Sequence, residues 1–229
     1  MNFEKNSNAL LLIPTFNEAK NISRLLDEIS LYFEEVLVVD DCSEDNTVIL
    51  ISDKNIKIIS HLINLGQGGA LETGFIYFLN NTNLEYIVTF DGDGQHRVKD
   101  AYNMINYAKD FKLDAVIGSR FLTKKAIKKI PFSKKLTLRL ARIYESIFFS
   151  INLTDAHNGL RVLSRKVVNK NILPIRNYDM SHATEISGKI CNGNVRFKEF
   201  PVIINYENKK SQKPINAINI LINFLFKRQ

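Results

Sequence analysis

The sequence predicts an α/β protein in which a mostly parallel central sheet is flanked by helices. Short apolar segments alternate along the chain with longer segments whose apolar residues recur every three or four positions. This alternation is typical of parallel strands joined by helices. The strand-like segments are apolar throughout, which is expected where helices cover both faces of a sheet.

Five strands are predicted in the first 120 residues. Residues 9–13 are apolar and are followed by Pro14, which indicates a buried strand. Residues 35–40 form the second apolar segment and end in an aspartate. The other predicted strands cover residues 56–60, 86–90 and 115–118.

Helical periodicity separates these strands. The stripe that follows the first strand consists of Ile22, Leu25, Leu26, Ile29 and Phe33. A short helix is expected over residues 46–53. Longer helices are predicted over residues 66–80, which begin with glycines, and over residues 98–111.

The pattern changes after Arg120. Residues 124–135 are rich in lysine with interleaved apolar residues, and an amphipathic stretch continues to residue 151. Residues 195–206 are expected to form a strand or one arm of a hairpin, and residues 215–226 an apolar helix. No internal repeat or flexible linker divides the chain, so we expect a single domain over residues 1–229.

Composition and charge narrow the function. The formal net charge of +7 favours an anionic partner, which would be a nucleic acid, a phosphorylated ligand or an acidic membrane surface. General solubility is the alternative explanation. No run of 18 apolar residues is present, so no membrane-spanning segment is expected. The two cysteines, Cys42 and Cys191, form no metal-binding pattern and indicate reduced thiols in a cytoplasmic protein.

Acidic side chains follow three of the predicted strands at the point where each strand ends. Glu18 follows the first strand, Asp40 and Asp41 end the second, and Asp91 and Asp93 end the fourth. Because ligands of open α/β sheets bind beyond the carboxyl ends of the strands, these carboxylates should converge on one rim. They would repel one another there, unless a divalent cation with a phosphate-bearing ligand lay between them.

The Asp-Gly-Asp-Gly stretch at residues 91–94 has two other readings. By itself it is explained equally well by a solvated turn, since aspartate and glycine are common turn residues. A calcium-binding loop of the EF-hand type does not fit, because His96 occupies the position of that loop's glycine and Tyr102 that of its glutamate.

Six stretches in a fixed order resemble the family 2 glycosyltransferases of GT-A fold, in particular the polyprenyl-phosphate sugar transferases of the dolichol-phosphate mannose synthase type. The stretches are residues 13–18, 39–47, 64–70, 91–96, 118–120 and 154–161. The resemblance implies the GT-A fold, with a nucleotide-sugar-binding half over residues 1–120. Residues 121–229 would form the acceptor half, with an amphipathic helix at the C-terminus.

The resemblance also implies roles for individual residues. The residues expected to bind the nucleotide sugar are Pro14, Phe16, Glu18, Asp40, Asp41, Gly68, Asp91, Gly92 and Arg120. Carboxylates suit ribose hydroxyls and ring N–H donors, and a guanidinium group suits phosphate oxygens. Mg²⁺ or Mn²⁺ on the diphosphate would be held by Asp91, Asp93 and Gln95.

The implied reaction is an inverting displacement at the sugar's anomeric carbon, with the nucleoside diphosphate as leaving group. The expected acceptor is a polyprenyl phosphate. Candidates for a catalytic base are Asp93, Asp155 and Glu185. The residues expected to contact the acceptor or a membrane surface are Lys128, Lys129, Lys134, Lys135, Arg161 and His182.

Several alternatives stay open at this point. The acceptor could instead be a saccharide hydroxyl in surface polysaccharide assembly. A nucleotidylyltransferase is a weaker alternative, because residues 14–21 contain no glycine. Nucleic acid is not an expected partner, since the carboxylates cluster where its phosphates would lie. We expect a cytoplasmic protein. Peripheral attachment to the cytoplasmic face of the inner membrane is left open, and so is association with a membrane protein or with further copies of this chain.

Overall fold

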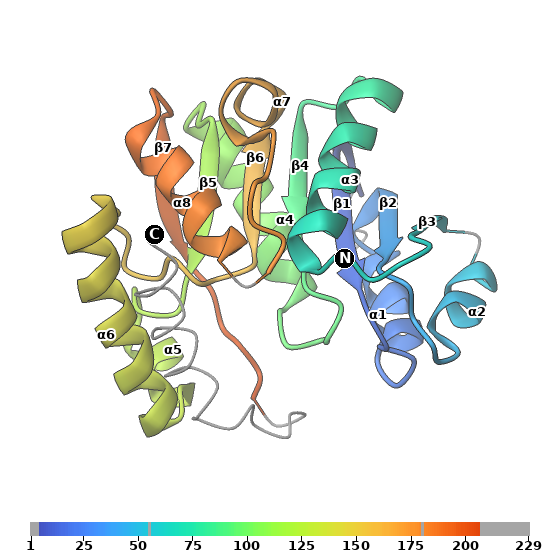
Figure 1. Ribbon diagram of the computed structural model, residues 1–229, viewed down its shortest axis with the longest axis horizontal. Coiled ribbons are helices and arrows are strands. Elements are labelled where there is room, and N and C mark those ends of the chain that lie inside the picture. Colours follow the sequence, from blue (N-terminus) through green and yellow to red (C-terminus); the bar gives the residue numbers. More distant parts are fainter. Residues whose placement is uncertain (1–4, 55, 180, 207–229) are drawn as a thin grey trace.

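A seven-stranded sheet with the order β3-β2-β1-β4-β6-β5-β7 forms the centre of the computed structural model (Figure 1). The structure describes residues 5–206 apart from 55 and 180, so the helix expected over residues 215–226 lies outside the described residues. The strands are β1 (Asn6–Thr15), β2 (Phe33–Asp40), β3 (Lys57–Ser60), β4 (Tyr86–Thr89), β5 (Ala115–Ser119), β6 (Arg161–Ser164) and β7 (Phe197–Pro201).

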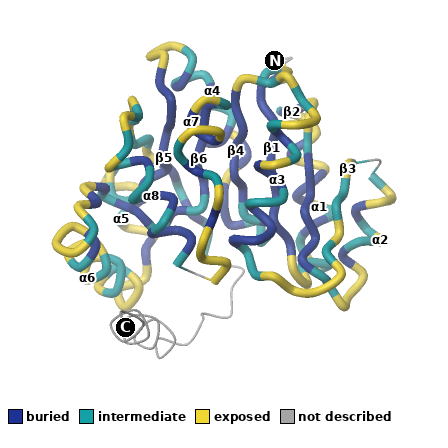
Figure 2. The backbone as a smooth tube through the Cα atoms, turned by 45° about the horizontal axis from the view of Figure 1, so that its top comes forward, coloured by how far each residue is buried: buried dark blue, intermediate teal, exposed yellow. Residues whose placement is uncertain are grey.

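The helices cover both faces of this sheet, as the apolar strands predict. They are α1 (Ile22–Ile29), α2 (Thr47–Ser52), α3 (Gln67–Asn81), α4 (Val98–Asp110), α5 (Lys124–Lys129), α6 (Phe132–Phe149), α7 (Arg165–Val167) and α8 (His182–Asn192), and the π-helical turn η1 covers Val168–Ile172. Apolar residues of α1 and α4 pack with one face of the strands, and those of α3, η1 and α8 pack with the other. The central strands are consequently buried along most of their length (Figure 2).

Parallel pairing dominates the sheet, as predicted. Strands β1, β2, β3 and β4 pair in parallel with one another, and β5 pairs in parallel with β7. The carboxyl ends of β1, β2 and β4 therefore lie at one edge of the sheet, where the acidic residues follow them.

Strand β6 was not expected from the sequence, and it runs antiparallel between β4 and β5. Its four residues, Arg-Val-Leu-Ser, are too short and too polar at both ends to give a strand pattern. In its register Arg161 pairs with Thr89 at the carboxyl end of β4. The segment that enters β6 is thereby brought to the same edge as the residues that follow β4.

One expectation needs correction, and one choice between alternatives is decided. Phe33, which was placed on the helical stripe after β1, is the first residue of β2. It is nevertheless buried in the same core as that stripe. The prediction that Phe33 is a core residue is therefore confirmed, and its assignment to the helix is wrong. For residues 195–206 the first of the two alternatives is confirmed, since they contain β7, which pairs in parallel with β5 at the edge of the sheet.

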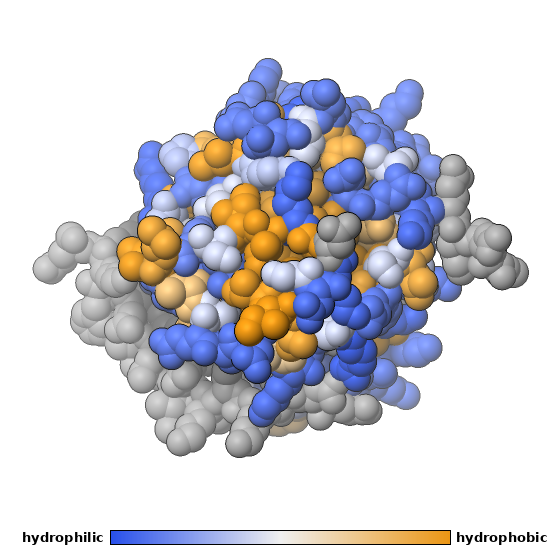
Figure 3. Space-filling view, turned by 90° about the vertical axis from the view of Figure 1, so that its right-hand side faces the viewer, coloured by the Kyte–Doolittle hydropathy of each residue, from blue (hydrophilic) through white to orange (hydrophobic). Residues whose placement is uncertain are grey.

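The β3 edge of the sheet carries exposed apolar side chains. Figure 3 faces this edge and shows an apolar area in the middle of it. Exposed apolar residues of α2 and of the segment after β3 include Ile49, Leu62 and Ile63. No helix within the described part of the chain is both long enough and apolar enough to cross a membrane.

Candidate functional site

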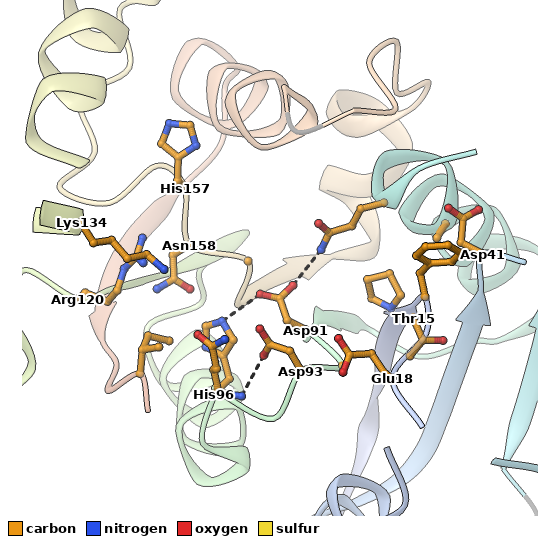
Figure 4. Close-up of a pocket in the computed structure, with 18 residues that line it drawn as sticks. Thr15, Glu18, Asp41, Asp91, Asp93, His96, Arg120, Lys134, His157 and Asn158 are labelled. Atoms are coloured by element: carbon orange, nitrogen blue, oxygen red, sulfur yellow. Dashed lines mark hydrogen bonds and ion pairs between the residues drawn. The ribbon is translucent and has the colours of Figure 1, made fainter. Parts of the chain in front are cut away.

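A cleft with a volume of about 430 Å³ opens at the carboxyl ends of β1 and β4. One of its walls is acidic and carries Glu18, Asp41, Asp91 and Asp93 (Figure 4). These carboxylates come from segments that follow three different strands, so the predicted convergence is present in the structure. Of the other residues expected to bind a nucleotide sugar, Pro14, Phe16, Gly92 and Arg120 also line the cleft.

Asp41 forms hydrogen bonds with the segment that precedes α3. Its carboxylate accepts hydrogen bonds from the backbone N–H groups of Leu65 (2.9 Å) and Gly66 (2.7 Å). It also pairs with Nδ1 of His61 at 2.8 Å. These contacts satisfy the carboxylate within the protein, so Asp41 shapes the cleft from its edge.

Asp40 does not line the cleft. Its Oδ2 accepts a hydrogen bond from the backbone N–H of Ser43 at 3.0 Å. Its Oδ1 is buried and has no hydrogen-bond partner among the described residues. The expectation that Asp40 contacts the nucleotide sugar is therefore not met in the described structure, because the residue is 1% exposed.

Asp91 is braced from two sides at the centre of the cleft. Gln67 donates its Nε2 hydrogen to Oδ1 at 3.0 Å, and Nε2 of His96 lies 3.3 Å from Oδ2 (Figure 4). On a further side the chain passes so close that a Cβ atom at Gly159 would lie 2.5 Å from Oδ2. Only glycine fits at position 159 while Asp91 keeps this orientation.

The donor set at the end of β4 fits a divalent cation that also binds a diphosphate. Asp91, Asp93 and Gln95 all line the cleft, and hard cations such as Mg²⁺ prefer oxygen ligands. Nε2 of Gln95 is buried with no partner among the described residues. The described part of the chain contains no group of three His, Cys, Asp or Glu residues that could hold a metal by themselves. Mg²⁺ typically takes one or two carboxylates and completes its shell with phosphate oxygens and water, so this donor set agrees with its usual mode.

The opposite wall of the cleft is basic and carries Arg120, Lys134 and His157. Arg120 forms a bidentate ion pair with Asp155, with two N–O distances of 2.6 Å. Although burial raises the pKa of Asp155, the attraction of the Arg120 guanidinium outweighs it and holds this pKa below its ordinary value. Burial lowers the pKa of Arg120, but Asp155 more than offsets it and the net shift is upward.

Neither Asp155 nor Glu185, both candidates for a catalytic base, lines the cleft. Asp155 is 3% exposed and forms an ion pair with Arg120, so it holds the basic wall in place. Glu185 accepts hydrogen bonds from the backbone N–H groups of Arg176 and Asn177, and forms an ion pair with Lys189 at 2.7 Å. Of the three candidates, only Asp93 is at the cleft.

Gly68 contacts another part of the chain rather than the cleft. Its backbone N–H donates to the carbonyl of Tyr178 at 3.0 Å, and an added Cβ atom would lie 2.5 Å from the carbonyl oxygen of Asn177. The absence of a side chain at Gly68 allows the backbone of residues 177–178 to approach closely, and Gly68 is not among the residues that line the cleft.

Arg161 and His182 are not in a position to contact an acceptor or a membrane. Arg161 is 1% exposed and donates Nη2 hydrogens to the carbonyls of Ala156 and Ala183. Burial lowers its pKa to about 10, and the charge of Asp91 is the largest of the effects that oppose this shift. His182 is 4% exposed, and burial lowers its pKa as well. Both expectations failed because a charged residue type does not reveal that its position is enclosed.

Lys134 is the member of the lysine-rich segment that reaches the cleft, and its Nζ lies 4.9 Å from the ring centre of Tyr206. Lys128 and Lys129 are exposed on α5, and Lys135 is half-buried at the start of α6. None of these three lines the cleft.

Sequence reasoning missed several residues that build the site. Gln67 and His96 brace Asp91, and His157, Asn158 and Gly159 supply part of the basic wall. The stretch at residues 154–161 does carry the signal for the last three residues. Its role was hidden because β6, which brings it to the cleft, was not expected.

The comparisons with known proteins place the chain in a family. Residues 11–172 match the family model "Glycosyl transferase family 2", so this chain belongs to glycosyltransferase family 2. It is 27% identical to the UDP-N-acetylglucosamine–dolichyl-phosphate N-acetylglucosaminyltransferase of Methanococcus voltae, over 93% of this chain and 91% of that protein. It is 26% identical to the polyprenol monophosphomannose synthase of Mycolicibacterium smegmatis, over 70% of this chain and 63% of that protein. These relatives support the predicted polyprenyl-phosphate sugar transferase branch.

The GT-A fold is confirmed by a solved structure. Glucosyl-3-phosphoglycerate synthase of Mycobacterium tuberculosis superposes with a TM-score of 0.70 and 17% identity, covering 96% of this chain and 80% of that one. A further structure of that enzyme contains Mn²⁺ and UDP, with a TM-score of 0.66 and 15% identity over 96% of this chain and 79% of that one.

We expect Asp155→Asn to destabilise the protein by about 3–5 kcal/mol at pH 7, because it leaves the buried Arg120 cation without its partner. The folded-state pKa of Asp155 lies below the unfolded value of about 3.9, so its contribution is complete above that pH and is lost as the pH falls. Urea unfolding at pH 7 measures the loss of the ion pair, and a series of pH values below about 3.9 measures its pH dependence. Asp110→Asn, on the exposed end of α4, is the control, and a loss below about 1 kcal/mol for Asp155→Asn would contradict the assignment.

Proposed function

We propose that this glycosyltransferase moves a sugar from a nucleoside-diphosphate sugar to a polyprenyl phosphate, with Mg²⁺ or Mn²⁺ bound at Asp91 and Asp93. The observation that carries the proposal is the cleft in which the carboxylates at the ends of β1, β2 and β4 face a basic wall. A metal-bound diphosphate complements the first wall, and an anionic acceptor complements the second.

The nucleotide would lie over the carboxyl ends of β1 and β2. Phe16 is 45% exposed at the cleft and offers an aromatic face to the base. Glu18 also lines the cleft, and its carboxylate can accept hydrogen bonds from a ribose hydroxyl or a ring N–H. Asp40 has no direct role in this assignment, because it is 1% exposed and does not line the cleft. We assign Gly68 no contact with the nucleotide, because it lies against the backbone of residues 177–178.

The cation would be held by Asp91, Asp93 and Gln95 together with oxygens of the diphosphate. When bound, it would neutralise the negative charge that grows on the leaving group. Gln67, His96 and Gly159 fix the orientation of Asp91 before any ligand arrives. Such support reduces the reorganisation that ligand binding requires. The Mn²⁺ and UDP bound by the mycobacterial structural neighbour agree with this assignment.

The displacement would form a bond between an acceptor phosphate oxygen and the anomeric carbon, while the bond from that carbon to the diphosphate breaks. A phosphate monoester is already anionic near neutral pH, so it needs no catalytic base. This agrees with the absence of Asp155 and Glu185 from the lining of the cleft. The names of the relatives from M. voltae and M. smegmatis indicate lipid phosphates as their acceptors or products.

Helices α5 and α6 would place the cleft at an acidic membrane surface. Along α6 a stripe of exposed apolar residues faces away from the sheet, and we call it the α6 stripe. It consists of Phe132, Leu136, Leu140, Ile143 and Ile147. Exposed basic residues of α5 and α6 accompany it, namely Lys124, Lys125, Lys128, Lys129, Arg139 and Arg142. Apolar side chains flanked by cations suit the boundary between acyl chains and anionic headgroups.

The first test replaces a carboxylate of the proposed metal site. Asp93→Asn should lower sugar transfer about a hundredfold or more while the melting temperature stays within a few degrees, because an amide oxygen holds a divalent cation more weakly. A thermal-shift screen with UDP-, GDP- and dTDP-sugars identifies the donor, and a transfer assay with a polyprenyl phosphate gives the rate. Asp110→Asn serves as control, and full activity in Asp93→Asn would overturn the metal assignment.

Metal removal gives the second test. EDTA should abolish transfer, and Mg²⁺ or Mn²⁺ should restore it. The affinity for the nucleoside diphosphate of the identified donor, measured by calorimetry, should fall in EDTA as well, because the carboxylates of the acidic wall then repel the diphosphate. Equal affinity and equal activity with and without metal would show that the carboxylates have another role.

The third test concerns the membrane surface. Replacement of four lysines by glutamine should weaken binding to vesicles containing phosphatidylglycerol about a hundredfold or more at low salt, and less at high salt. The four are Lys124, Lys125, Lys128 and Lys129. A control variant carries the same replacements at lysines remote from α5 and α6, namely Lys20, Lys54, Lys109 and Lys112. Sedimentation with vesicles measures the binding, and similar losses in both variants would remove the assigned role of α5.

A further inference from the structure

His157 and Glu145 form a pair for which the reaction proposed above gives no role. Nε2 of His157 lies 3.1 Å from Oε1 of Glu145, and His157 lines the basic wall of the cleft. The pair joins two distant segments, since His157 precedes β6 and Glu145 belongs to α6. It therefore connects the helix that carries the α6 stripe with the basic wall of the cleft.

Glu145 is an unusual residue for its helix. It is 3% exposed and is the only buried residue of α6, all of whose residues are among those described. Its Oε1 accepts a hydrogen bond from the hydroxyl of Thr184 at 2.8 Å. Among the described residues, His157 is the only basic side chain within ion-pair distance of this carboxylate. A buried carboxylate is expensive unless it is paired, so Glu145 fixes the imidazole firmly.

The contact with Glu145 decides which part of the imidazole faces a ligand. Because Nε2 points to the carboxylate, Nδ1 is the ring nitrogen left for a molecule in the cleft. The carboxylate only accepts hydrogen bonds, and so does a phosphate oxyanion. An imidazole bound between the two must carry a proton on each nitrogen and donates to both.

The location of His157 matches the acceptor rather than the donor. In Figure 4, His157, Asn158, Lys134 and Arg120 lie on one side of Asp91, while Glu18 and Asp41 lie on the other. The carboxylates take the side where the metal-bound diphosphate is placed. An anion that enters from the surface beside α6 would reach the basic side first.

We propose that His157, positioned by Glu145, binds the phosphate oxyanion of the acceptor through Nδ1–H. This inference rests on the proposed function, because it needs a phosphate as acceptor. His157 is the residue that contacts the acceptor, and Glu145 is a positioning residue that acts through it. The alternative in which Nδ1 removes a proton from an acceptor hydroxyl needs a neutral ring, and the experiment below separates the two.

The test measures the affinity of farnesyl phosphate for the full chain loaded with Mg²⁺ and the nucleoside diphosphate of its donor, by calorimetry. His157→Gln should weaken this affinity about tenfold, the usual loss for one charge-assisted hydrogen bond. Glu145→Gln should weaken it in the same direction. Nucleoside diphosphate affinity should stay unchanged in both variants. Ser146→Ala, next to Glu145 on the exposed side of α6, is the matched control and should bind farnesyl phosphate like the wild type.

A spectroscopic readout separates positioning from simple support of the fold. In the wild type, farnesyl phosphate should move the ring ¹⁵N resonances of His157 to those of an imidazolium, and in Glu145→Gln this change should be absent or reduced. Undiminished farnesyl phosphate affinity in His157→Gln would overturn the inference alone. A fall in transfer rate at unchanged affinity would overturn it in favour of proton abstraction. A wild type that binds the nucleotide but no farnesyl phosphate would overturn the phosphate acceptor of the proposed function and this inference with it.

Discussion

Repulsion between carboxylates is the constraint around which the site is built. Strands β1, β2 and β4 end side by side, so their acidic residues meet in a small volume of reduced dielectric. The protein relieves part of this repulsion itself. Two backbone N–H groups and His61 satisfy Asp41. Gln67 and His96 contact the carboxylate of Asp91, which also interacts electrostatically with the buried Arg161 cation. A divalent cation would neutralise the repulsion that these contacts leave between the carboxylates, which is the physical basis for the proposed metal site.

The basic wall exists because β6 runs against the direction of its neighbours. An antiparallel strand begins where the parallel strand beside it ends, so residues 154–160 are delivered to the ends of β4 and β5. Glu199 of β7 accepts hydrogen bonds from the hydroxyl and the backbone N–H of Thr154, which fixes the start of this segment. Asp155 then holds Arg120, and Gly159 passes against Asp91. One segment thereby supports both walls.

Helix α6 is attached in a way that reverses the usual amphipathic arrangement. Its apolar stripe faces outward, and its one fully buried residue is the charged Glu145. Phe149 at the end of the helix packs against the core, whereas the α6 stripe is left for another surface to cover. The same helix contributes Lys134 to the cleft. Surface attachment and acceptor entry are therefore linked in the proposed function through one element.

The sequence by itself determined the α/β class, most strands and helices of the first 120 residues, and the carboxylates that line the cleft. These follow from local periodicity and from the rule that parallel strands present their carboxyl ends at one edge. Only the tertiary structure decided which charged residues are enclosed. Arg161 and His182 are buried, and Asp155 is paired with Arg120, whereas His157 lines the cleft. The reason is that β6 is too short for a periodic signal, and its antiparallel pairing fixes the place of every residue around it.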